Sequence, residues 1–495
     1  MNEGNVSAMS SQPLLALPTD IYRLVFGHLD VADILVLRQT CKEFHELSIL
    51  RSVWDTLLRR HIINQNIPIP GLDGKTLDSL SSSELEGCYR RALALRRNWT
   101  STTPTVRRHI NIDNGVPNSR IIAIVPLPER ANRRIVSLSM TPGQHRVFTL
   151  QCWDVGGIIP VCLATHEMKQ FRGMAVNRVA CDHGDVAVLT LDLEILSIDS
   201  ETVNPQQGFV TKTLIPDAQR LHALHLFSKS SFLTRDTNGL VYLWDMNTPY
   251  KRWQLQNPNI AQPRPLVDIL ITDNFIVASW LTTLELYIRP SESAASANND
   301  VFLHPISIFT WPWRIDNAVM TLTHRPGPSQ GRTPIDILLR FGSYYPWPLN
   351  ILHHYEIRPN PDFLTDPGIG MSEHNPPYEF PPILLESIAS PVRLHATTDM
   401  AIGPYGTAIW TDSHTEDYFN HSDRGQRVAS TFSRYIVNDE GEEEVELSDQ
   451  VATASAATVY AYHEEDSWVR VAMDEIEGRI FLGHDNGLLS VLEYA

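Results

Sequence analysis

The feature that most constrains this chain is a repeat of short β-type segments at intervals of about 45 residues. The dipeptide Trp-Asp occurs at Trp153-Asp154 and at Trp244-Asp245. These copies lie about 90 residues apart, or two units of the 40–45 residues typical of a propeller blade. Another strand-like run, EILSIDS, ends near the midpoint at Ile198. The spacing therefore predicts a ring of repeated sheets, a β-propeller.

Residues 105–495 consist of short runs of period two, rich in Val, Ile, Leu, Thr and Tyr and separated by turn residues. Asn238-Gly239 and Asn486-Gly487 predict type I′ hairpin turns, because this dipeptide tolerates positive φ values. A pair of β-sandwiches is the structural alternative, but it would not explain the regular interval. The ends of the second strand of each hairpin define seven units, at Trp153, Ile198, Trp244, Tyr287, Tyr355, Trp410 and Leu492.

The later repeats are longer, and the additional residues have loop composition. They fall in residues 291–300, the proline-rich 359–382 and the acidic 412–453. The last repeat ends with what looks like the third strand of a blade. We therefore expect a strand within residues 105–113 to supply the outer strand and close the ring.

Residues 13–60 carry a helical pattern instead. Pro18 suits the first turn of a helix, and Ile21, Leu24 and Val25 recur at spacings of three and four. Asp30 is placed to cap a second helix, and two more short helices follow. Four short helices make a very small core with more apolar positions than it can bury, so the module is expected to pack against a partner.

These residues resemble the F-box family. Two positions depart slightly from the common pattern, Asp20 in place of Glu and Phe44 in place of Trp. The family elements stand here as Leu17-Pro18, Ile21, Val25-Phe26, Leu29-Asp30, Ile34 to Leu37, Cys41, Phe44 and Val53-Trp54. The resemblance implies binding to the Skp-type adaptor of an SCF ubiquitin ligase, and through it to a cullin. The adaptor-binding residues that it implies are Leu17, Pro18, Ile21, Val25, Leu29, Ile34, Leu37 and Cys41.

The flanking segments complete the domain organisation. Residues 1–12 are polar and aperiodic and are expected to be a disordered tail. Residues 61–104 are expected to form a helical linker, in which Ser83 and Glu86 have the spacing of a capping box. The propeller part resembles WD-repeat-like domains, although only two units keep Trp-Asp. The expected fold is thus multidomain, a small all-α F-box module joined by a helical linker to an all-β propeller of seven blades.

The composition excludes several classes of function. With 57 Asp and Glu against 40 Lys and Arg, the formal charge of −17 repels a phosphate backbone, so no nucleic-acid partner is expected. No apolar run approaches the length that spans a bilayer, so no membrane partner is expected. Five cysteines without a close metal-type pair fit a reducing compartment, and the N-terminus has no signal-peptide pattern. We expect a cytoplasmic or nuclear protein.

Common catalytic and cofactor motifs are absent from the sequence, which has no nucleophile elbow, phosphate loop, dinucleotide fingerprint, His-Glu-x-x-His or Cys-x-x-Cys. His353 and His354 are adjacent on one strand and so point to opposite faces, and the acidic run 439–446 has loop composition. Neither pattern favours a metal site. No catalytic residue, metal or cofactor is therefore expected.

Aromatic residues gather in the middle of the predicted propeller. Loop aromatics are favoured binding anchors on propeller faces, although they also pack between blades. The candidate substrate-binding residues are Trp311, Trp313, Tyr344, Tyr345 and Trp347. The expected function is a non-catalytic receptor that presents an unidentified protein for ubiquitination. The alternatives are an F-box scaffold that does not act in degradation and a propeller with an unrecognised small-molecule activity.

Overall fold

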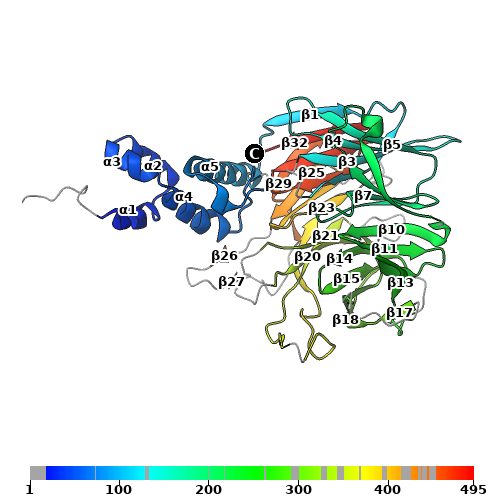
Figure 1. Cartoon of the computed structure of the whole chain (residues 1–495). Helices are drawn as coiled ribbons and strands as arrows, with labels where there is room; N and C mark the ends of the chain where they lie inside the picture. The colour runs from blue at the N-terminus through cyan, green and yellow to red at the C-terminus, as the bar shows by residue number, and fades with distance from the viewer. Residues whose placement is uncertain are drawn as a thin grey trace, which may run out of the picture. The chain divides into compact units, whose positions relative to one another are not determined.

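A computed structural model describes the protein from Pro18 onward. The described residues are 18–72, 74–128, 133–199, 201–216, 218–260, 264–290, 300–324, 332–342, 350–366, 369–392, 398–413, 425–432, 436–437, 443–444 and 453–495. The chain divides into two compact units, Met1–Ala94 and Leu95–Ala495. Figure 1 shows the helices of the first unit in blue and the sheets of the second from cyan to red.

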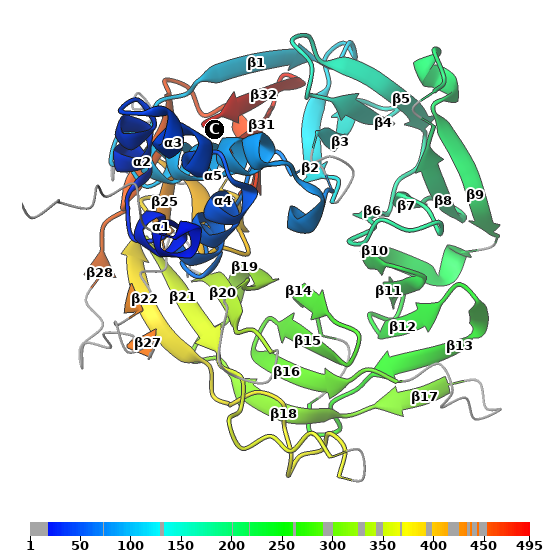
Figure 2. The same ribbon diagram turned by 60° about the vertical axis from the view of Figure 1, so that its left-hand side comes forward.

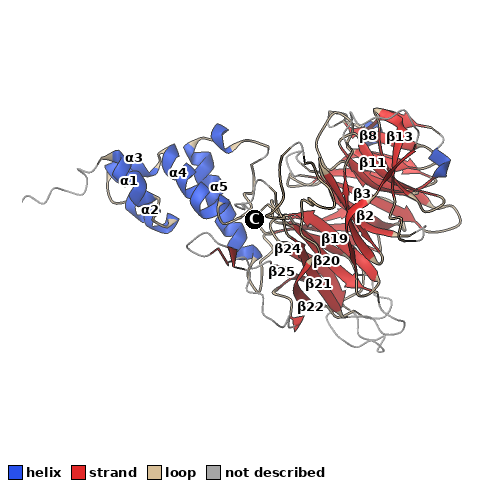
Figure 3. Cartoon of the chain, turned by 90° about the horizontal axis from the view of Figure 1, so that it is seen from below, coloured by secondary structure: helices blue, strands red, loops and turns tan. Residues whose placement is uncertain are grey.

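The first unit is helical, as Figure 3 shows. Four helices of seven or eight residues precede a π-helix and a 3-10 turn, and a long helix then crosses from this unit into the next. The elements are α1 (Thr19–Phe26), α2 (Val31–Arg38), α3 (Lys42–Ser48), α4 (Arg51–Leu58), η2 (Arg59–Ile63), η3 (Leu77–Ser79) and α5 (Ser82–Trp99). The predicted helical module is therefore confirmed.

The core of the first unit is shared between the four short helices and α5. Trp54 and Leu57 of α4 are completely buried, and Leu85 and Tyr89 of α5 belong to the same apolar cluster. The ring of Tyr89 meets Trp54 edge to face at 5.9 Å. Because four helices of this length cannot enclose an apolar core alone, the chain itself supplies part of the packing that the sequence assigns to a partner.

The start of α5 differs from the predicted capping box at Ser83 and Glu86. The cap is Ser81, whose hydroxyl accepts the Glu84 N–H at 3.3 Å while the Glu84 carboxylate accepts the Ser81 N–H at 2.8 Å. Glu86 instead pairs with Arg38 of α2 through two hydrogen bonds of 3.1 and 2.9 Å. Both spacings satisfy the capping-box pattern, and the cross-helix ion pair decides between them.

The second unit is a seven-bladed propeller, and Figure 2 shows its blades arranged around a ring. Each blade contains four antiparallel strands in chain order, except that the last blade takes its outer strand from the N-terminal side, and two blades also carry a fifth, parallel strand. Blades one to three are β2 (Arg120–Pro126), β3 (Arg134–Thr141), β4 (Val147–Asp154), β5 (Val161–Met168); β6 (Gly173–Val176), β7 (Val186–Leu189), β8 (Leu193–Ile198), β9 (Phe209–Ile215); and β10 (Leu221–Ser228), β11 (Ser231–Asp236), β12 (Val241–Asp245), β13 (Thr248–Leu255). The 3-10 turns η4 (Pro205–Gln207) and η5 (Ala218–Arg220) join neighbouring strands here.

The remaining blades follow the same pattern. They are β14 (Leu266–Ile271), β15 (Phe275–Trp280), β16 (Thr283–Ile288), β18 (Pro305–Thr310); β19 (Ile315–Leu322), β20 (Ile335–Phe341), β21 (Ile351–Ile357), β22 (Ile383–Ala389); β23 (Met400–Ile402), β24 (Thr407–Ser413), β25 (Gln426–Phe432), β29 (Thr458–His463); and β30 (Trp468–Asp474), β31 (Arg479–His484), β32 (Leu488–Glu493), β1 (Arg108–Asp113). A two-stranded ribbon, β26 (Ile436–Val437) with β27 (Glu443–Glu444), lies outside the blades. This architecture confirms the expected fold class and excludes the sandwich alternative.

The propeller core consists of separate apolar layers between successive blades. Blades four and five, for example, share a cluster that includes Val277 and Leu286 from one sheet and Ile337 and Ile357 from the next. Comparable clusters lie at the other blade junctions. Alternate residues of each strand face each neighbouring blade, which explains why central strands such as β15 and β20 are buried along their whole length.

Ring closure joins the two ends of the propeller sequence. β1 lies within the segment expected to close the ring and pairs antiparallel with β32, from Arg108 opposite Glu493 to Asp113 opposite Leu488. The Arg108 guanidinium lies 3.3 Å from the Glu493 carboxylate. The last blade is therefore held together by strands nearly 380 residues apart.

The two Asn-Gly turns are not of the predicted type I′. Only the glycines have positive φ, +79° at Gly239 and +87° at Gly487, whereas type I′ requires positive φ at both central residues. In the first turn the Asp236 carboxylate accepts the N–H groups of Asn238 and Leu240 at 2.9 and 2.8 Å. This pattern corresponds to a three-residue turn in which only the glycine adopts the left-handed conformation. The Asp236 carboxylate stabilises this turn by accepting the two backbone N–H groups.

Two sequence assignments within the propeller were wrong. Trp410 lies in β24, the second strand of the sixth blade, whereas the six other strand-end markers lie in third strands. The third strand is β25, which falls inside the segment 412–453 that was assigned entirely to loop. This seven-residue strand lies within a segment whose acidic composition led to its assignment as a loop.

Two insertions also add fifth strands to other blades. β17 (Asp300–Leu303), at the end of the insertion 291–300, pairs in parallel with β13. β28 (Thr453–Ala454) pairs in parallel with β22 of the fifth blade. These pairings join segments that are distant in sequence, and the period-two pattern does not predict them.

Candidate functional site

Helix α1 has two apolar faces with different roles. Tyr22 and Phe26 are buried and meet the ring of Phe44 edge to face at 5.8 and 6.5 Å. On the other face Leu24 is 64% exposed and Val25 46% exposed. The predicted stripe of residues 21, 24 and 25 therefore faces solvent in this chain, and the helix packs through residues that the stripe leaves out.

Helix α2 also carries apolar side chains in two environments. Ile34 is completely buried, whereas Val36 is 64% exposed. Leu37 and Leu29 are half-buried and pack at the edge of the helical core. Leu24 and Val36 thus add to the exposed apolar side chains that the two helices carry, beside Ile21 and Val25. We call Ile21, Leu24, Val25 and Val36 the apolar docking residues.

Polar contacts hold these short helices in place. The Arg38 guanidinium bonds both Glu86 and the hydroxyl of Ser48, and the carbonyl of Ser48 accepts the Trp54 indole N–H at 2.9 Å. The Arg38 and Glu86 side chains are only 18% and 15% exposed. Because the pair links α2 to α5, it fixes the presentation of α2 rather than contributing a free charge to the surface.

The loop after α2 is shaped by Cys41. This residue is half-buried and caps α3, with its sulfur accepting the Phe44 N–H at 3.5 Å. The end of α1 is tied by Arg60, which donates to the carbonyl of Gly27 at 3.0 Å. Cys41 therefore stabilises the turn that places α3 against α1.

The structure divides the described members of the predicted adaptor-binding set into two groups. Exposed side chains are Pro18, Ile21 and Val25. Supporting side chains are Leu29, Ile34, Leu37 and Cys41, which are half-buried or buried. Leu17 lies outside the described residues. Sequence reasoning left Leu24 and Val36 out of the set, although Leu24 shares the helical spacing of Ile21 and Val25.

The five aromatic candidates of the propeller do not form one described cluster. Trp311 is 4% exposed and packs between blades against Phe309 and Tyr355, with ring centroids 5.1 and 5.2 Å away. Trp313 is 59% exposed. Tyr344, Tyr345 and Trp347 lie outside the described residues. A tryptophan that fills a blade junction has a packing role, so Trp311 is not available to a partner.

The two adjacent histidines of β21 occupy different environments. His353 contacts the hydroxyl of Ser387 at 3.1 Å. His354 is completely buried between the carboxylates of Asp336 at 3.8 Å and Glu386 at 3.6 Å. Burial opposes its charge, but the two carboxylates raise the pKa of His354 to about 9. Among the described residues, no group of three or more potential ligands has the arrangement of a metal site.

A membrane-spanning helix is not found in the described part of the chain, where no helix is both long enough and apolar enough.

Comparison with known proteins assigns the helical module. Residues 14–60 match the family model described as F-box-like. No curated protein sequence matches the chain significantly. The matched range covers α1 to α4 and therefore contains all the apolar docking residues.

Solved propellers resemble the second unit at low sequence identity. The β-propeller domain of Cps50 (Swd1) from Myceliophteria thermophila has a TM-score of 0.46 and 11% identity, over 79% of this chain and 100% of that chain. The WD40 propeller domain of Doa1 has a TM-score of 0.41 and 8% identity, over 79% and 97%. The C-terminal WD40 domain of Sif2 has a TM-score of 0.40 and 9% identity, over 76% and 82%. The strand pairing establishes the blade count independently of these similarities, and the chain thus combines an N-terminal F-box-like domain with a seven-bladed β-propeller.

Proposed function

We propose that this chain is the substrate-recognition subunit of an SCF-type cullin ubiquitin ligase. The F-box-like domain would bind a Skp-type adaptor, and the propeller would hold the protein to be ubiquitinated, in the cytoplasm or nucleus. On this proposal the chain itself catalyses no reaction. The observation that carries it is the exposed apolar surface of α1 and α2 within the matched F-box-like range.

The apolar docking residues support a helix-packing interface. They lie on helices whose inner faces are already satisfied by Tyr22, Phe26 and Ile34, so the outer faces are free to contact a partner. Burying a large aliphatic side chain from water contributes about 1.5–3 kcal/mol. We propose that Pro18, Ile21, Leu24, Val25 and Val36 contact the adaptor, while the half-buried and buried members of the set hold the helices in register.

Single charges placed on this surface test the proposal. Leu24→Glu or Val36→Glu should weaken adaptor binding on the order of a hundredfold, because the interface would have to bury an unpaired carboxylate. Both positions are more than half exposed, so the fold should tolerate the change. The measurement is co-purification and titration of the full chain with a recombinant Skp-type adaptor.

The matched control is Thr56→Glu, which adds the same charge at an exposed position of α4. This variant should retain wild-type adaptor affinity. Circular dichroism of all three variants checks that the helical unit stays folded. Undiminished adaptor binding by folded Leu24→Glu and Val36→Glu would refute the assignment of the interface.

A further inference from the structure

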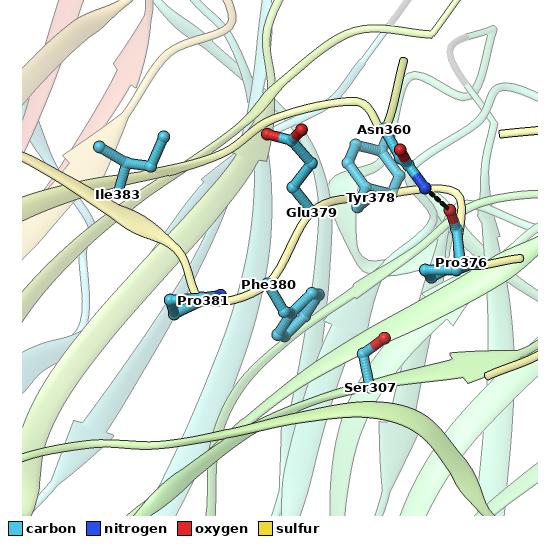
Figure 4. A pocket seen from close by; sticks show the side chains of 8 residues that line it. All are labelled: Ser307, Asn360, Pro376, Tyr378, Glu379, Phe380, Pro381 and Ile383. Carbon is cyan, nitrogen blue, oxygen red and sulfur yellow. Dashed lines mark hydrogen bonds between the residues drawn. The ribbon is translucent and has the colours of Figure 1, made fainter. Parts of the chain in front are cut away.

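A cleft lies at the outer rim of the propeller, between β18 of the fourth blade and the insertion that leads into β22 of the fifth. Its volume is about 510 Å³, within the range of specific binding pockets, and it is lined by Ser307, Asn360 and most of the segment 376–383. Figure 4 shows these side chains and the hydrogen bond between Asn360 and Pro376. This cleft is separate from the apolar docking residues of the F-box-like domain.

The inserted wall of the cleft is held in a defined conformation. The Asn360 side chain donates to the carbonyl of Pro376 at 2.9 Å. Tyr378 is buried, its hydroxyl donates to the carbonyl of Thr333 at 3.0 Å, and its ring meets Phe275 of the fourth blade at 5.0 Å. A wall fixed by such contacts loses little conformational entropy when a ligand binds.

The charged side chains of the inserted wall itself have one sign, although two arginines lie beside it: Arg358, which pairs with Glu356 at 2.8 Å, and Arg332, which stacks on Phe363 at 3.7 Å from the ring centroid. Residues 359–382 contain four acidic residues, Asp362, Asp366, Glu373 and Glu379, and no Lys or Arg. Glu379 lines the cleft and is exposed, and its carboxylate has no ion-pair partner among the described residues. Such a surface attracts a cationic side chain and repels a phosphorylated or acidic one.

The remaining lining is apolar. Phe380 and Ile383 are half-buried, and Pro381 is exposed beside them. An aliphatic side chain can pack against these groups while a neighbouring ammonium or guanidinium reaches Glu379. Binding pockets are lined mainly by apolar and aromatic side chains with a few placed polar groups, and aromatic-lined grooves bind extended peptides.

We propose that this cleft binds an extended segment of a client protein that carries Lys or Arg next to an apolar residue. Glu379 pairs with the cation, and Phe380, Pro381 and Ile383 contact the apolar side chain. Recognition at this site does not require phosphorylation of the client. This inference rests on the proposed role of the propeller as substrate receptor and names the chemical class of segment that it takes.

Selection from a peptide library tests the proposal. The probe is a set of fluorescein-labelled nonapeptides with acetylated and amidated ends, in which one central position is fixed as Lys, Arg, phosphoserine or Glu and its neighbour as Leu or Ser. Binding to the purified full chain is measured by fluorescence anisotropy without adaptor. We expect the Lys-Leu and Arg-Leu peptides to bind on the order of tenfold more tightly than the Glu-Leu and phosphoserine-Leu peptides, as one charge-assisted hydrogen bond predicts.

Variants of the cleft residues test whether the preference for Lys or Arg peptides arises at the cleft. Glu379→Gln should abolish the preference for a cation, and Glu379→Lys should reverse it in favour of Glu. Glu373→Lys makes the same charge change at an exposed position of the same insertion that does not line the cleft, and should keep the wild-type preference. Equal effects of Glu379→Lys and Glu373→Lys, or a wild-type chain without cation preference, would overturn the inference.

The result of the peptide experiment can be distinguished from the result of the adaptor-binding experiment. Leu24→Glu should leave peptide selection unchanged, because it alters only the F-box-like domain. Adaptor binding without peptide selection would remove this inference and leave the adaptor-binding role intact. Peptide selection without adaptor binding would support the cleft and refute the SCF assignment.

Discussion

At the scale of single residues, buried charge in the propeller depends on paired partners. In the fourth blade Arg264 and Glu285 are both buried and bond through two N–H groups of the guanidinium. In the fifth blade His354 lies between Asp336 and Glu386. The Glu386 carboxylate also accepts the Thr431 hydroxyl at 2.8 Å. These groups are costly to bury singly, so each is paired with an opposite charge.

His354 makes the stability of the propeller depend on pH. Its pKa is raised to about 9 in the folded chain, above the ordinary value of 6.5, so the folded state holds the proton more tightly. The resulting stabilisation is complete below pH 6.5 and is lost as the pH rises through about 9. His354→Gln should lower the free energy of unfolding on the order of 1–3 kcal/mol at pH 6 and by less at pH 9.

Urea unfolding at both pH values checks this expectation, with exposed His374→Gln as the control. The difference between wild type and His374→Gln should be small and independent of pH. A deficit in His354→Gln that is equal at pH 6 and pH 9 would mean that lost packing, and not the proton, accounts for the stability.

At the scale of elements, the C-terminal end of α5 is built into the propeller core. Trp99 donates its indole N–H to the Thr407 hydroxyl at 3.0 Å and lies against Tyr460 and Tyr494, with ring centroids 4.7 and 5.5 Å away. The side-chain amide of Asn98 bonds the carbonyl of Tyr494 at 2.8 Å. The last turn of this helix thus fills the junction of the sixth and seventh blades.

Truncation of this anchor should destabilise the propeller. Trp99→Ala should cost about 3–5 kcal/mol, because it opens a cavity among aromatic rings, and Trp99→Phe about 1–3 kcal/mol. Trp313→Ala, at an exposed tryptophan, should change stability by less than about 0.5 kcal/mol. Denaturant unfolding and amide hydrogen exchange of residues 95–105 measure these effects. Unchanged exchange in Trp99→Ala would contradict the anchoring role.

At the scale of the whole molecule, the ring depends on the pairing of β1 with β32. Asn111 lies opposite Ser490, and their side chains are hydrogen bonded at 2.8 Å. No other described blade joins strands from both ends of the propeller sequence. Opening this one pairing would expose two sheet edges, so the junction controls the integrity of the ring.

A disulfide across the junction should therefore stabilise the ring. The double variant Asn111→Cys and Ser490→Cys should raise the free energy of unfolding by about 2–4 kcal/mol when oxidised, because it closes a very long loop in the unfolded chain. The thermal midpoint is measured with and without reductant, and the single variants serve as controls. Failure of the folded double variant to form the disulfide would contradict the register of these two strands.

Local patterns were sufficient for the type and order of most elements. The F-box-like helices follow from apolar spacing and the Leu-Pro to Val-Trp pattern, and the blades follow from repeated period-two hairpins. Ile21 and Val25 were placed among the adaptor-binding candidates by the same pattern, and both are exposed. These features depend on residues within a few positions of one another, so the sequence determined them by itself.

Only the tertiary structure decided which apolar side chains are free and which segments complete each sheet. Leu24 and Val36 are exposed while Ile34 and Trp311 are buried, because burial depends on helices and blades that are remote in sequence. β25 was hidden in an acidic stretch, and β17 and β28 pair with strands of other blades. Strand partners across long loops leave no local periodicity, and the rim cleft, which joins the fourth blade to an insertion in the fifth, exists only once the ring is assembled.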